Sequence, residues 1–223
     1  MKRKRVTLLL ALLAFTLTAL AETTAPIKRI LFFGDSQTGW MGERLGAWGQ
    51  ANGFDVVTVT WDGATPQKWA ATGKIPSYIA KYHPDMVMIN LGMNELLERN
   101  PAKNLGPSMS TIIKAIGDRP FVWIGPLEWP GKGKGEVLVN YLQKTVDATG
   151  NGHFFNASGQ KIPRQSRTNP HPTQAGAYTL MDHVMQWLPS TGIHFPHEPL
   201  VAPASGKGHR GPNFIYKRQN QRP

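Results

Sequence analysis

The sequence predicts an α/β protein, a three-layer α/β/α sandwich in which helices cover both faces of a parallel sheet. Short apolar and β-branched runs recur along the chain, as expected of strands that are buried on both faces. Segments with apolar residues at helical spacing separate these runs. Such an alternation of strand and helix is typical of parallel sheets with right-handed crossovers.

Five segments have the composition of buried strands. They are rich in apolar and β-branched residues, and a residue that favours turns stands at or just after the end of each one. The predicted strands are residues 30–33, 55–61, 85–91, 120–124 and 153–156. The first strand is followed directly by Gly34-Asp35-Ser36, which predicts a sharp turn into a helix.

Five further segments have the periodicity of helices. In the first of them Met41, Leu45 and Trp48 recur at i, i+4 and i+7, and Gly53 suits the end of a helix. In the last of them Thr173 suits the N-cap position. The predicted helices are residues 38–52, 75–82, 109–116, 136–148 and 173–187.

The two ends of the chain differ from this α/β segment. Residues 1–21 combine a basic start, an apolar stretch and an A-x-A cleavage pattern, which predicts a bacterial export signal and a periplasmic or secreted protein. The apolar stretch is shorter than the roughly 20 residues of a membrane span, so we expect no stable membrane insertion after cleavage. Residues 22–189 form the predicted domain. Residues 190–223 form a basic tail, rich in Pro and Gly, that we expect to be extended or disordered.

The composition excludes several classes of chemistry and makes some binding partners poor candidates. The 223 residues include no cysteine, which excludes disulfides, thiolate nucleophiles and cysteine-bound zinc. The formal net charge is +11, but an exported protein is a poor candidate for binding nucleic acid, and no phosphate-binding G-x-x-x-x-G-K-[ST] motif is present. We expect no cofactor and no metal, because the spacing of His194, His197 and Glu198 does not by itself indicate a metal site. The oligomeric state is not predicted.

Four residues of complementary chemistry stand in the predicted loops: Ser36, Gly63, Asn94 and His171. The first three follow predicted strands, and the last precedes the final helix. Because the carboxyl ends of parallel strands meet at one edge of the sheet, we expect these residues to lie close together. A serine needs a base to become nucleophilic, and the oxyanion that it forms needs N–H donors. The pattern therefore indicates a serine hydrolase.

Four short motifs in this order resemble those of the SGNH or GDSL hydrolase superfamily: Gly34-Asp35-Ser36, Gly63, Gly92-x-Asn94 and His171-Pro172. The resemblance covers residues 30–188. It implies a flavodoxin-like sheet of strand order 2-1-3-4-5 and an esterase, lipase or carbohydrate deacetylase. It also implies that Ser36 is the nucleophile and His171 the base. The oxyanion hole would be formed by the N–H groups of Ser36 and Gly63 and the amide of Asn94.

The chain departs from the superfamily pattern at the third catalytic position. Where these hydrolases usually have an aspartate, three residues before the histidine, the sequence has Thr168, and no acidic residue stands near it. A backbone carbonyl of Thr168 or Asn169, or the side chain of Asn169, remains to orient the imidazole. We therefore expect a dyad of Ser36 and His171, in which the charged imidazole is stabilised less than it would be by a carboxylate.

Two tryptophans near the predicted strand ends, Trp40 and Trp61, are candidates for stacking on a sugar ring, although core packing is the alternative. With the export signal they favour an esterase that removes acetyl or other short acyl groups from an envelope or extracellular glycan. The expected partner is thus a small acyl ester or an acylated glycan. An O-acyltransferase acting on envelope polysaccharide and a non-catalytic glycan-binding protein are the alternatives, the latter because the aspartate is missing.

Overall fold

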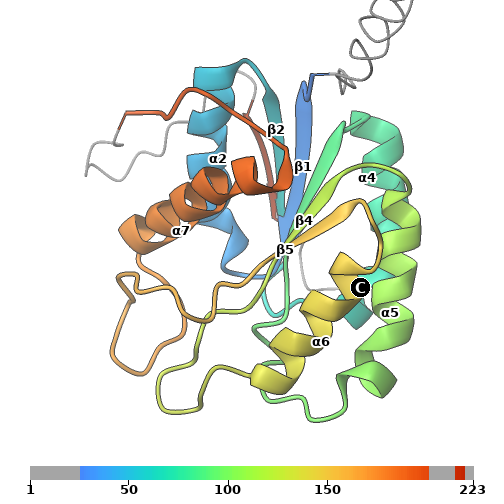
Figure 1. Ribbon diagram of the computed structural model, residues 1–223, viewed down its shortest axis with the longest axis vertical. Helices are drawn as coiled ribbons and strands as arrows, with labels where there is room; N and C mark the ends of the chain where they lie inside the picture. The colour runs from blue at the N-terminus through green and yellow to red at the C-terminus, as the bar shows by residue number, and fades with distance from the viewer. Residues whose placement is uncertain (1–25, 201–213, 219–223) are drawn as a thin grey trace, which may run out of the picture.

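The computed structural model describes residues 26–200 and 214–218, and strands and helices alternate along most of them (Figure 1). The predicted signal peptide lies outside the described residues. The strands are β1 Arg29–Gly34, β2 Asp55–Thr60, β3 Met86–Asn90, β4 Phe121–Ile124, β5 Gly152–Phe155 and β6 Phe214–Arg218. The α-helices are α2 Thr38–Asn52, α3 Pro66–Ala71, α4 Lys74–Tyr82, α5 Pro101–Ile116, α6 Glu136–Asp147 and α7 Gln174–Trp187, and a short 3₁₀-helix η1 spans Leu188–Thr191. None of the helices in the described part of the chain is long and apolar enough to span a membrane.

The strands form one parallel sheet in the order β5-β4-β3-β1-β2-β6. The first five strands therefore have the predicted order 2-1-3-4-5, and β6 extends the sheet beyond β2. All of the carboxyl ends point to one edge of the sheet. This edge carries the loops in which the sequence places the candidate site.

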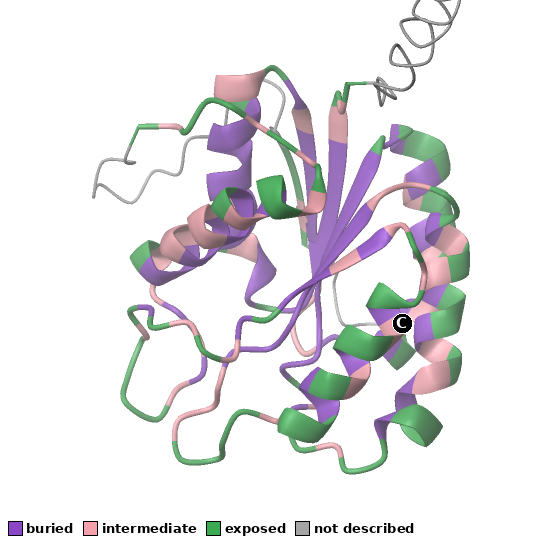
Figure 2. Ribbon diagram, in the orientation of Figure 1, coloured by how far each residue is buried: buried purple, intermediate pink, exposed green. Residues whose placement is uncertain are grey.

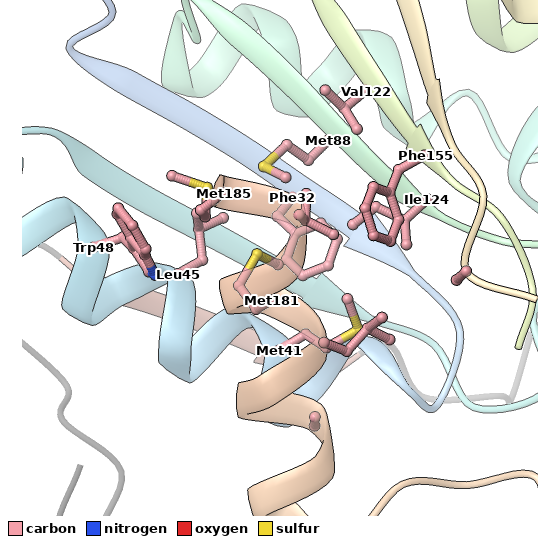
Figure 3. Close-up of a cluster of buried hydrophobic side chains, with 14 of the residues drawn as sticks. Phe32, Met41, Leu45, Trp48, Met88, Val122, Ile124, Phe155, Met181 and Met185 are labelled. Atoms are coloured by element: carbon pink, nitrogen blue, oxygen red, sulfur yellow. The ribbon is translucent and has the colours of Figure 1, made fainter. Parts of the chain in front are cut away.

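Helices cover both faces of the sheet, as predicted. Helices α2 and α7 pack on one face, and α3, α4, α5 and α6 pack on the other. On β1, Phe32 faces the first layer, where it lies with Met41 of α2 and Met181 of α7 (Figure 3). Its neighbour Phe33 faces the second layer and contacts Trp69 of α3. The central strands are consequently buried along most of their length (Figure 2).

Two helices differ from the prediction because of their prolines. Helix α3 was not predicted, since Pro66 reads as a loop residue; in the structure it is the first residue of the helix, after the N-cap Thr65. Helix α5 begins at Pro101, earlier than the predicted residue 109, and contains Pro107. A proline at the first helical position costs no hydrogen bond, so Pro66 and Pro101 are compatible with helix starts. Pro107 lacks one backbone donor, but α5 continues through it.

The C-terminal tail contributes an ordered strand that the sequence pattern did not predict. After η1, the backbone of His197 forms two hydrogen bonds with the Asn52 side chain, and Arg44 donates to the carbonyls of Pro199 and Leu200. The tail was expected to be extended or disordered. Its residues 214–218 are extended, and they form β6 beside β2.

Candidate active site

Ser36 lies on the turn between β1 and α2, at the carboxyl edge of the sheet. The turn is tight because Gly34 allows β1 to approach β3: a Cβ on Gly34 would lie 2.2 Å from the carbonyl oxygen of Asn90. The Asp35 N–H donates to the same carbonyl, at 3.1 Å, and the Thr38 N–H closes the turn on the Asp35 carbonyl. The Ser36 side chain is thereby exposed at the end of a buried strand.

Ser36 and His171 meet across the sheet edge, although they are 135 residues apart in the sequence. The Ser36 Oγ lies 2.9 Å from Nε2 of His171. This distance is that of a hydrogen bond, and it is within reach for proton transfer from the hydroxyl to the ring. The structure thus brings together the two residues that the sequence proposed as nucleophile and base.

The far side of the His171 ring contacts Asn169. The Oδ1 atom of Asn169 lies 2.9 Å from Nδ1 of His171 and accepts the backbone N–H of His171 at the same distance. The Nδ2 of Asn169 donates to Oε1 of Gln165. Since Oδ1 is an acceptor, the ring carries its proton on Nδ1, and Nε2 is left to accept the proton of Ser36.

Of the two residues considered for orienting His171, Asn169 is the one that contacts the ring. The Thr168 carbonyl accepts from Nε1 of Trp129, at 3.2 Å, and the Thr168 hydroxyl lies 3.5 Å from that of Ser166. The geometry is therefore a chain of serine, histidine and asparagine rather than a dyad. The Asn169 side chain was one of the candidates named from the sequence, and it stands one residue after Thr168, where the superfamily usually has its aspartate.

The surroundings of His171 favour the neutral imidazole. Burial lowers the pKa of His171 from its ordinary value of 6.5, and the Asp62 carboxylate opposes this effect only in part. The neutral amide of Asn169 adds no charge to stabilise an imidazolium. His171 is therefore available as a base at neutral pH.

Gly63 and Asn94, two of the three predicted oxyanion donors, lie on loops that are linked to each other. Gly63 follows β2 in a turn with a φ of 65°, a conformation that favours glycine. Asn94 follows β3, and its Nδ2 donates to the carbonyl of Ala64 at 2.8 Å. An amide nitrogen has two protons, so this bond fixes the Asn94 side chain and leaves the second proton for a ligand. Lys68 also donates to the Gly63 carbonyl.

No protein-family model matches the sequence, and no curated protein matches it. Solved structures do match. A G-D-S-L family protein from Desulfitobacterium hafniense DCB-2 is 15% identical, with a TM-score of 0.54 over 70% of this chain and 96% of that chain. TesA is 22% identical, with a TM-score of 0.59 over 72% of this chain and 98% of that chain. A family 3 carbohydrate esterase from Clostridium thermocellum is 17% identical, with a TM-score of 0.58 over 74% of this chain and 96% of that chain.

The chain has the SGNH/GDSL hydrolase fold. The strand order that the sequence motifs implied is the order of β1 to β5 in this chain. Strand β6 extends the sheet at the edge formed by β2.

Two carboxyl groups in the motif loops of this SGNH/GDSL fold have little contact with solvent: Asp35 is buried and Glu95 is half-buried. Asp35 is 1% exposed, and burial raises its pKa to about 7; Asp62 adds to the effect, while the N–H of Gln37 opposes it. Burial, and then the charge of Asp35, raise the pKa of Glu95 to about 8. Within the described residues, Oδ2 of Asp35 and Oε2 of Glu95 have no hydrogen-bond partner. Neither carboxyl group was predicted to act in catalysis.

The two predicted stacking residues differ in exposure. Trp61 is half-buried and packs edge-on against Trp69, with the Lys74 ammonium 5.4 Å from its ring, so it belongs largely to the α3–α4 layer. Trp40 is 40% exposed on α2. Trp129 was not predicted as a site residue, but its indole donates to the Thr168 carbonyl in the loop of His171. Its position shortly after the predicted strand 120–124 was the available signal.

The described residues contain no group of three or more His, Asp or Glu side chains arranged to hold a metal ion.

Proposed function

We propose that the chain is a serine esterase that hydrolyses acetyl or other short acyl esters. The observation that carries this proposal is the contact of 2.9 Å between Ser36 Oγ and His171 Nε2, on a ring whose other nitrogen is bound by Asn169. This arrangement supplies a nucleophile, a base and an orienting group in one chain of hydrogen bonds.

The reaction begins with attack of Ser36 Oγ on the ester carbonyl carbon, while Nε2 of His171 takes the hydroxyl proton. The N–H groups of Ser36 and Gly63 and the free amide proton of Asn94 bind the oxyanion. The tetrahedral intermediate then collapses, and the imidazolium returns its proton to the leaving alcohol. In the second half, His171 takes a proton from a water molecule that attacks the acyl carbon. The bond between this carbon and Ser36 Oγ then breaks, the imidazolium returns its proton to Oγ, and the acid is released.

Asn169 performs the orienting part of the role that an aspartate has in other serine hydrolases. It holds the Nδ1–H tautomer but contributes no negative charge to the imidazolium. We therefore infer a slower enzyme than one with a carboxylate at this place. The missing aspartate was the reason for considering a protein that only binds glycan. Because Asn169 orients the ring in its place, this reason is weaker.

We infer that the natural substrate is an acylated glycan outside the cytoplasm. The predicted export signal at residues 1–21 supports this location, and the exposed Trp40 on α2 is suited to stacking on a sugar. One of the similar structures is a family 3 carbohydrate esterase, which is consistent with such a substrate.

Hydrolysis of p-nitrophenyl acetate by the chain without residues 1–21 tests the activity. We expect Ser36→Ala to lower kcat by at least about a thousandfold, because the nucleophile is lost. Equal rates for the wild type and Ser36→Ala would contradict the proposal. Release of acetate from acetylated xylan, compared with release from a soluble acetyl ester, tests the glycan assignment.

A further inference from the structure

We propose that the C-terminal strand β6 contributes a positioning residue to the active site. Arg218 is a positioning residue that, through Asp62, holds the loop that presents the N–H of Gly63. The inference rests on the proposed function, in which this N–H binds the oxyanion.

Strand β6 reaches the active-site edge because of its register. It runs parallel to β2, with Val56 opposite Phe214 and Thr60 opposite Arg218. Since Thr60 is the last residue of β2, Arg218 lies beside the start of the loop that contains Asp62 and Gly63. A strand that ended two residues earlier would not reach this loop.

Arg218 forms an ion pair with Asp62, from Nη2 to Oδ2. Asp62 is the residue before Gly63, and its carboxylate is the charge that acts on His171. The Arg218 side chain is 66% exposed, so the pair contributes little to the free energy of unfolding. Its consequence is local, because it fixes the Asp62 carboxylate and with it the backbone next to Gly63.

Tyr216 makes the second contact between β6 and the site. Its hydroxyl lies 3.2 Å from Oγ1 of Thr60, and a Cβ on Gly39 would lie 3.4 Å from the same hydroxyl. Gly39 is in the first turn of α2, directly after the Ser36 turn. The face of β6 that carries Tyr216 and Arg218 therefore contacts both the nucleophile's helix and the end of β2.

The intervening residue on β6 provides a matched control. Side chains alternate along a strand, and Lys217 points to the other face, where its ammonium lies 5.9 Å from the Tyr82 ring. Arg218→Gln and Lys217→Gln remove the same charge from adjacent positions of the same strand. Only the first removes the ion pair with Asp62.

We expect Arg218→Gln to lower kcat for p-nitrophenyl acetate by about tenfold, less than the hundredfold or more that follows loss of an oxyanion donor. KM should change less than twofold. Arg218→Lys should restore most of kcat, and Lys217→Gln should match the wild type. If Arg218→Gln has the wild-type kcat, or if Lys217→Gln is equally slow, the proposal is wrong.

Hydrogen–deuterium exchange of peptides that cover residues 61–65 gives a second readout, which needs no ester hydrolysis. We expect faster exchange in Arg218→Gln and unchanged exchange in Lys217→Gln. If the wild type hydrolyses no ester, the proposed function fails, and the exchange alone decides whether Arg218 holds the loop. Wild-type exchange in Arg218→Gln would overturn the inference.

Discussion

At the scale of single residues, Asn169 sets the chemistry of this site apart from that of a hydrolase with an aspartate. Its Oδ1 accepts from both the backbone and the ring of His171, so orientation is secured without charge. The cost lies in the imidazolium, because the group bound to its Nδ1 is a neutral amide and not a carboxylate. Orientation and charge stabilisation can therefore be separated here by one substitution.

Asn169→Asp should raise kcat/KM for p-nitrophenyl acetate by about tenfold at pH 8, because a carboxylate stabilises the imidazolium in the transition state. The new charge also raises the pKa of His171, so the acid limb of the pH profile moves to higher pH. In the wild type burial lowers the pKa of His171, and activity should persist below pH 6.5.

Thr168→Asp is the matched control, since the Thr168 side chain lies by Ser166 rather than by the His171 ring. Its pH profile should follow that of the wild type. A larger gain from Thr168→Asp than from Asn169→Asp would show that the third position has been assigned to the wrong residue.

Asn94→Ala should lower kcat by about a hundredfold to a thousandfold with a small change in KM, as expected for the loss of an oxyanion donor. The variant also loses the bond to Ala64, which should lower the free energy of unfolding by about 1 kcal/mol. Steady-state kinetics and urea unfolding measure the two effects separately. A change in stability with no change in kcat would leave Asn94 a structural residue only.

At the scale of elements, the turns after β1 and β3 each carry a carboxyl group whose pKa is raised by burial, Asp35 and Glu95. The pKa of Asp35 is about 7 in the folded chain against an ordinary value of 3.8. The folded state therefore holds this proton more tightly than the unfolded state. The stability that follows is fully present below pH 3.8 and is lost as the pH rises through about 7.

Asp35→Asn should remove this loss, because an amide does not ionise. We expect the variant to exceed the wild type by about 2 kcal/mol in the free energy of unfolding at pH 8, and the difference to shrink toward pH 5. Urea unfolding at the two pH values measures it. Greater stability of the wild type at pH 8 would mean that another group stabilises the Asp35 carboxylate.

At the scale of the whole molecule, much of the fold could be predicted from the sequence. The central strands are apolar on both faces, so β1 to β4 are visible as composition alone, and their order followed from the four motifs. Helix α3 was missed because a proline can stand either in a loop or at the first position of a helix, so Pro66 alone does not distinguish the two. Strand β6 was missed because its pairing with β2 is not local, and its exposed residues lack the pattern of a buried strand.

In the candidate site, too, some residues are indicated by the sequence and others are identified only by the folded structure. Ser36 and His171 were predictable, since each stands in a motif that ends a strand or begins a helix. The roles of Trp129 and Arg218 depend on loops and a strand that meet only in the folded chain. No spacing along the sequence indicates such contacts.

The central claim is that His171 activates Ser36, and covalent labelling by a fluorophosphonate tests it most directly. Mass spectrometry of the labelled wild type should locate the phosphonyl group on the peptide that contains Ser36. His171→Ala should slow the labelling by at least about a hundredfold, because the hydroxyl loses its base. Labelling at another residue, or equal labelling rates in the wild type and His171→Ala, would contradict the account.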